Sequence, residues 1–64
     1  MYKVSLLHEN NVIESFCKAR KEQAIKSAKG KVDFEWLVHG KNISAYISSD
    51  HFDCYVSRFE TIIY

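Results

Sequence analysis

Apolar and polar side chains alternate along residues 2–9, and residues 12–17 form a second segment of extended character. A period of two gives a β-strand one apolar and one polar face. The dipeptide Asn10-Asn11 separates the segments, and asparagine tolerates the positive φ of a two-residue hairpin turn. The pattern predicts an N-terminal β-hairpin with its turn at these asparagines, in which Val4 would face Cys17.

Residues 20–29 consist mostly of good helix formers. Ala24, Ile25 and Ala28 form a narrow apolar stripe of small side chains, which lets a helix lie close to a sheet. Gly30 follows where a left-handed helix cap would fall. We therefore expect one short helix, about 15 Å long at ~1.5 Å per residue.

Alternation returns in residues 32–38, which we interpret as the third strand. The dipeptide Gly40-Lys41 places glycine at the first central position of a two-residue turn, as a type II′ hairpin requires. Trp36 would then pair with Ala45, and every apolar residue of this second hairpin would fall on one face.

A turn at residues 49–51 separates the last two predicted strands. If they pair across it, Ile47 meets Cys54 on the inner face, and Tyr46 meets Tyr55 on the outer face. The final residues, 60–64, either continue the fifth strand or form an apolar tail.

The elements assemble into one α+β domain spanning residues 1–64. We expect a single antiparallel sheet of four to five strands, with ββαβββ connectivity and strand order 2-1-3-4-5. One short helix packs on one face of this sheet. Such a helix cannot cover a sheet of five strands spaced ~4.8 Å apart, so aromatic side chains on the other face would need a partner from outside.

This outline resembles the small hairpin–helix–hairpin domains of bacterial and phage proteins of unknown function. The resemblance covers about the first fifty residues and rests on a lysine-rich helix with alanines between two hairpins, Lys21-Glu22-Gln23-Ala24-Ile25 and Ala28. It implies a fold and no activity, and no functional residue is taken from it.

Charge is strongly segregated, although the formal net charge of the 64 residues is only +1. Residues 18–31 hold six Lys or Arg and one Glu, whereas residues 32–64 hold five acidic and two basic residues. A hydrophobic fraction of 47% argues against disorder. The chain shows no signal-peptide pattern and no apolar stretch long enough to cross a bilayer, so we expect a soluble cytoplasmic protein without membrane contact.

Our first candidate site is the outer face of the second half of the sheet. Tyrosine and serine provide a large amphipathic contact area at low cost in side-chain entropy. Acidic residues nearby would complement a basic partner. We expect this face to bind another protein, or a second copy of the chain, through Glu35, Tyr46, Asp53, Tyr55, Phe59 and Tyr64.

The second candidate is the basic segment around the helix. Its cations could contact the phosphates of a nucleic acid, and such binding would weaken steeply with salt. The residues concerned are Lys18, Arg20, Lys21, Lys26 and Lys29. The aromatic residues lie with acidic residues instead, which is the reverse of a single-strand stacking platform. The bland alternative for both candidates is an ordinary solvated surface.

Metal and catalytic chemistry have little support in the sequence. Cys17 and Cys54 lack the spacing of a metal or redox motif, and we expect both to be small buried hydrophobes. The histidines at positions 8, 39 and 51 do not converge with them in the predicted sheet. We expect no cofactor, no metal site and no enzymatic activity, and interpret the chain as a protein-binding inhibitor or adaptor, such as a phage-type protein that blocks a host factor.

Overall fold

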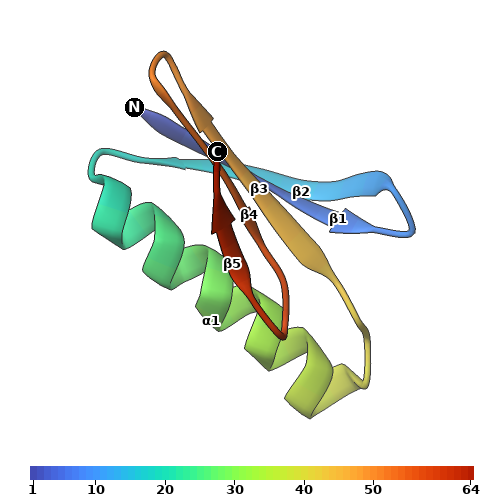
Figure 1. Cartoon of the computed structure of the whole chain (residues 1–64). Helices are drawn as coiled ribbons and strands as arrows, with labels where there is room; N and C mark the ends of the chain where they lie inside the picture. The colour runs from blue at the N-terminus through green and yellow to red at the C-terminus, as the bar shows by residue number, and fades with distance from the viewer.

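A five-stranded antiparallel sheet and one helix account for most of the chain in the computed structural model, which describes all 64 residues (Figure 1). The strand order β2-β1-β3-β4-β5 and the ββαβββ connectivity confirm the predicted α+β fold. The elements are β1 (Tyr2–His8), β2 (Asn11–Lys18), α1 (Lys21–His39), β3 (Ser44–Ser49), β4 (Phe52–Val56) and β5 (Thr61–Ile63).

The first hairpin forms as predicted, but its turn lies one residue earlier. Glu9 and Asn10 have φ angles of 53° and 67°, which are the two positive values of a type I′ turn. Together with a β-bulge in β2, this turn pairs Val4 with Phe16, and the predicted pairing with Cys17 is wrong. The register shifts between Leu6 and Leu7, where Ile13 is the extra residue of a β-bulge in β2.

Residues 32–38 are helical, so the predicted third strand is wrong. Helix α1 continues through Gly30, whose φ is not positive, and ends at Gly40, which has the left-handed φ of 63°. The Gly40 N–H donates a hydrogen bond to the Trp36 carbonyl at 3.0 Å. Gly40 is thus a helix cap rather than part of a hairpin turn, and the predicted pair of Trp36 with Ala45 does not exist.

A four-residue apolar spacing explains why the helix is longer than expected. Val32 follows Ala24 and Ala28 at i+4 intervals, and all three are fully buried against the sheet. Two side-chain contacts at the same spacing support the second half, the ion pair of Lys29 with Asp33 at 3.6 Å and the hydrogen bond between His39 and Glu35 at 3.0 Å. The period-two pattern of residues 32–38 instead spreads apolar side chains around the helix.

The second hairpin confirms the predicted register of the last half of the sheet. Ile47 pairs with Cys54, and Tyr46 pairs with Tyr55. Because residues 32–38 belong to the helix, β3 takes the place beside β1 that was assigned to them. Residues 61–63 reverse direction and form β5, so the chain still has five strands in the predicted order.

The hydrophobic core lies between α1 and one face of the sheet. Figure 1 shows the helix on that face, with its last turns extending beyond the strands. Phe34 and Leu37, in those turns, remain 51% and 80% exposed. The buried core residues are Val4, Leu6, Ala24, Ala28, Val32, Ile43, Ala45, Ile47, Cys54 and Val56. No element covers the opposite face, so the fully buried residues all lie on the helix side, and side chains of the opposite face such as Tyr46 and Tyr55 are half-buried.

Two glycine substitutions test the helix boundaries. A Cβ at Gly30 would contact nothing within 4 Å, so Gly30→Ala should raise the free energy of unfolding by about 0.5–1 kcal/mol through helix propensity. Gly40→Ala should lower the free energy of unfolding by about 1 kcal/mol because its φ is +63°. Thermal unfolding measures both, as shifts of opposite sign of roughly 5 °C. Destabilisation by Gly30→Ala would instead favour a helix that ends at residue 29.

Candidate functional site

The outer face of the sheet, on the side away from α1, carries a continuous row of side chains across four strands. Ser5 pairs with Tyr46, Tyr46 pairs with Tyr55, and Tyr55 pairs with Ile62. Directly paired residues point to the same face of an antiparallel sheet. The row therefore places two tyrosines side by side between a serine and an isoleucine.

A second row beside it is more polar. Lys3 pairs with Ser48, and Ser48 pairs with Asp53. The chain continues this row beyond β5, because the Tyr64 N–H donates a hydrogen bond to the Asp53 carbonyl at 3.0 Å. Tyr64 is 73% exposed. Asp53 and Tyr64 thus lie on the same face as Tyr46 and Tyr55, and we call these four residues the tyrosine face.

The Tyr46 hydroxyl has the most perturbed environment on this face. Desolvation by its neighbours raises the pKa of Tyr46 above its ordinary value of 10.0. The negative charge of Asp53, and that of Tyr64 when ionised, raise this pKa further, as does a hydrogen bond to Asp53. The phenol therefore stays protonated and can donate a hydrogen bond across the whole physiological pH range.

Phe59 lies at the rim of the tyrosine face, in the connection between β4 and β5. It lines a shallow pocket of about 330 Å³ together with Tyr55, Leu7 and Ser44, among others. Its ring is 80% exposed, and the Arg58 guanidinium lies 4.7 Å from its centroid. An exposed aromatic ring beside a hollow adds apolar area to this end of the face.

The same connection is tied to the helix by charge. The Arg58 guanidinium lies 3.5 Å from the centroid of the Trp36 ring, a cation–π contact. Lys29 Nζ donates hydrogen bonds to the Ser57 and Arg58 carbonyls at 3.2 and 3.1 Å. These contacts bridge α1 to the β4–β5 connection, and so hold the rim and β5 in place.

The connection itself is closed by Ser57. The Ser57 hydroxyl accepts hydrogen bonds from the backbone N–H groups of Phe59 and Glu60 at 3.4 and 3.2 Å. Serine side chains stabilise turns in this way. This turn, and with it the place of Ile62 on the outer face, was not predicted from the sequence, although a serine after a strand is a signal for such a turn.

Glu35 does not belong to the tyrosine face, contrary to the sequence prediction. It lies on α1, on the other side of the sheet, because residues 32–38 are helical. Its carboxylate lies 3.0 Å from His39 Nδ1. That hydrogen bond lowers the pKa of Glu35 below its ordinary value. The structure therefore brings together Tyr46, Asp53, Tyr55 and Tyr64, places Phe59 at their rim, and separates Glu35 from them.

The basic residues of the alternative site are partly engaged within the chain. Lys29 makes the contacts just described and an ion pair with Asp33. Lys21 Nζ lies 5.3 Å from the centroid of the Phe52 ring, and Lys18 Nζ lies 5.8 Å from that of Phe16. Arg20, which precedes the helix, makes no side-chain capping bond. Lys26 makes no ion pair. Because Lys29 and Lys31 are paired with Asp33 and Glu14, the segment does not present one uniform cationic surface.

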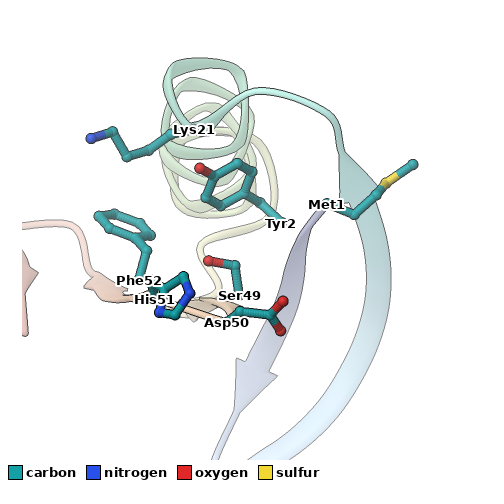
Figure 2. A pocket seen from close by; sticks show the side chains of 7 residues that line it. All are labelled: Met1, Tyr2, Lys21, Ser49, Asp50, His51 and Phe52. Atoms are coloured by element: carbon teal, nitrogen blue, oxygen red, sulfur yellow. The ribbon is translucent and has the colours of Figure 1, made fainter.

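A second hollow, of about 360 Å³, lies at the start of α1 and is shown in Figure 2. Tyr2 and Phe52 meet there edge to face with their centroids 5.9 Å apart. Ser49, His51 and Asp50 also line it, and the Asp50 carboxylate points away from Lys21 in Figure 2. Because no polar side chain of this hollow hydrogen-bonds to another, it offers no nucleophile paired with a base.

Metal-binding side chains are dispersed. No three His, Cys, Asp or Glu side chains lie close enough together to hold a metal ion. Both cysteines are free thiols. Cys54 is buried as expected, and burial raises the pKa of its thiol. Cys17 is exposed on β2, so the expectation that it would be buried is wrong.

Comparison of the chain with protein-family models, with curated proteins and with solved structures found no significant match. No helix of the structure combines the length and the apolar character required to span a membrane. The fold and the tyrosine face define a small α+β domain. Its core lies on one side of the sheet, and aromatic side chains lie on the other.

The raised pKa of Tyr46 has a consequence for stability at alkaline pH. The folded state holds the phenol proton more tightly than the unfolded state does, so this stabilisation is present below pH 10.0 and is lost as pH rises through the raised pKa. Phenolate absorbance should show one of the four tyrosines titrating above the ordinary range. Tyr46→Phe should remove that late titration, whereas Tyr55→Phe should retain it. A late titration that survives Tyr46→Phe would contradict the assignment.

Proposed function

We propose that this chain is a non-enzymatic protein-binding module of the cytoplasm, which acts as an inhibitor or adaptor through the tyrosine face. One observation carries the proposal. The single helix packs on only one face of the sheet, and the other face presents Tyr46 and Tyr55 side by side with nothing from the chain above them. A bare sheet face with adjacent aromatic side chains is typical of a contact surface.

The chemistry of the face suits a protein partner. Tyrosine supplies a large and fairly rigid contact area with a polar end, and the neighbouring serines supply adaptable hydrogen bonding. Ser5 lies beside Tyr46 on the neighbouring strand, and Ser48 lies beside Asp53. This combination favours a partner that contributes both apolar area and backbone carbonyls or other acceptors.

Charge adds a weaker preference. Asp53 is the carboxylate of the face, and it would complement a basic group of a partner. Lys3 lies in the same row, two strands away. Without Glu35, the face carries charges of both signs, so aromatic contact contributes more to binding than net charge does.

Nucleic-acid binding through the basic segment is the alternative function. It has less support because Lys29 is held by the β4–β5 connection and Lys31 pairs with Glu14 at 3.7 Å. Two of the remaining cations, Lys18 and Lys21, lie 5.8 and 5.3 Å from the centroids of the Phe16 and Phe52 rings, so they are partly engaged within the chain.

Substitution of the two central tyrosines tests the proposed function. The variant Tyr46→Ala with Tyr55→Ala should weaken complex formation by roughly 30-fold or more, since buried tyrosines contribute about 2 kcal/mol at interface hot spots. Partners captured from a lysate by the wild-type chain are quantified against the variant, with circular dichroism as a check of the fold. The matched control is Phe34→Ala with Leu37→Ala, which removes exposed apolar groups from the helix side and should leave capture unchanged.

A second pair of measurements separates the alternative. Replacement of Arg20, Lys21 and Lys26 by Gln should leave protein capture intact. Binding to a mixed-sequence oligonucleotide should be absent in the wild-type chain at low salt. Oligonucleotide binding that falls by orders of magnitude with added salt, and that the glutamine variant lacks, would support the nucleic-acid function and contradict the proposed one.

A further inference from the structure

The two edges of the sheet are very different. The outer edge on one side is β2, with eight residues, and on the other side it is β5, with three. An edge strand presents unpaired backbone N–H and C=O groups that can pair with another strand. Most residues of β2 are exposed, and no element of the chain covers its free side.

The hairpin geometry identifies which backbone groups of β2 are free. His8 and Asn11 flank the two-residue turn, and the flanking pair of such a hairpin exchanges both hydrogen bonds. The backbone N–H and C=O groups of the even-numbered residues of β1 therefore form hydrogen bonds with β2. Phe16, which pairs with Val4, directs its backbone groups to β1. Ser15 and Cys17 direct theirs outward.

The bulge limits the regular part of this edge. Ile13 is the unpaired residue, and a bulge bends and twists the strand at its position. The regular stretch therefore runs over residues 14–18, and its midpoint is Phe16. If two copies of β2 pair around a two-fold axis at that midpoint, the whole regular stretch of each strand is paired with that of the other.

We propose that β2 pairs antiparallel with β2 of a second copy of this chain, around a two-fold axis at Phe16. In this register Phe16 faces Phe16 of the second copy, and Ser15 faces Cys17 with both directing their backbone groups across the interface. Glu14 faces Lys18 of the second copy, and Lys18 faces Glu14. The two sheets join into one continuous sheet of ten strands.

Charge complementarity selects this register and orientation. Glu14 and Lys18 lie two positions on either side of Phe16, so rotation about Phe16 brings opposite charges together twice. A two-fold axis at Ser15 would place Glu14 against Phe16 instead, and a parallel pairing would set Glu14 against Glu14. The Glu14 carboxylate is half exposed and lies 3.7 Å from Lys31, so it remains accessible to a second cation.

A shallow cleft on the same side of the helix lies beside the proposed pairing. It has a volume of about 380 Å³ and is lined by Ser27, Gly30, Lys31 and Phe34. Lys31 reaches β2 through Glu14, so this flank of α1 faces the β2 edge. A two-fold axis perpendicular to the sheet puts both helices on the same side. The two clefts then face each other across the central phenylalanines.

This inference is independent of the proposed function. The pairing uses the β2 edge and leaves the half-buried Tyr46 and Tyr55 uncovered on the sheet face away from α1. A dimer formed through β2 would present two tyrosine faces to partners at once, which increases avidity for a partner with two copies of its site.

Charge reversal with rescue tests the pairing. Sedimentation equilibrium of the wild-type chain should show a monomer–dimer equilibrium. Glu14→Lys and Lys18→Glu should each weaken dimerisation by about tenfold, because each creates two like-charge contacts. The double variant should restore it. Lys31→Gln is the matched control, since it removes the internal ion pair and leaves both edge charges in place.

Oxidative cross-linking tests the register separately. Ser15→Cys places a new thiol opposite Cys17 of the second copy at a Cα separation of about 5.5 Å, which suits a disulfide. It should form a covalent dimer that reducing agent dissociates. Ser15→Cys with Cys17→Ser leaves only diagonal cysteines, about 7–8 Å apart, and should not cross-link.

Three outcomes would overturn the proposal. The first is a wild-type chain that stays monomeric at millimolar concentration. The second is a dimer that is insensitive to both charge reversals and is lost in Tyr46→Ala with Tyr55→Ala, which would place the interface on the tyrosine face. The third is cross-linking of the Ser15→Cys, Cys17→Ser variant with equal yield, which would set the two-fold axis at Ser15. Circular dichroism of each variant shows whether its fold is retained.

Discussion

The packing of three small side chains of α1 onto the inner face of the sheet determines the rest of this structure. Ala24, Ala28 and Val32 follow each other at four-residue intervals and are fully buried. Because they are small, the helix lies close to the sheet and contacts its central strands. One helix has one such stripe, so one face is covered and the other is left to water or to a partner. The bare face and the free β2 edge both follow from this arrangement.

Much of the fold could be predicted from the sequence, because turns and strand alternation are local signals. The pairing of Tyr46 with Tyr55 was correct, since a short turn fixes the register of its hairpin. The helix end was not predictable in the same way. Phe34 and Trp36 suggested a strand by period two, whereas Val32 continued a period of four that depends on tertiary burial. The sequence does not show whether a glycine such as Gly30 has a helical or a left-handed φ angle. Burial of Val32 against the sheet is what makes residues 32–38 helical rather than extended.

The candidate site was predictable to the extent that strand pairing was predictable. Tyr46, Asp53 and Tyr55 share a face because adjacent strands keep alternation in phase. Glu35 was misplaced together with the segment that contains it. Ile62 was missed because a reversal of the chain at Ser57 depends on a hydroxyl that accepts two backbone N–H groups, and a serine after a strand has many other uses.

The strand order has a consequence for how the chain folds. β1 with β2, and β3 with β4 and β5, are local units whose turns close within microseconds. The ladder between Lys3–Leu7 and Ser44–Ser48 is the only one that joins strands distant in sequence, across the whole of α1. Bringing the ends of such a long segment together lowers the chain entropy before the contacts between the two strands form. We therefore expect the pairing of β1 with β3 along this ladder to be the step that sets the folding rate.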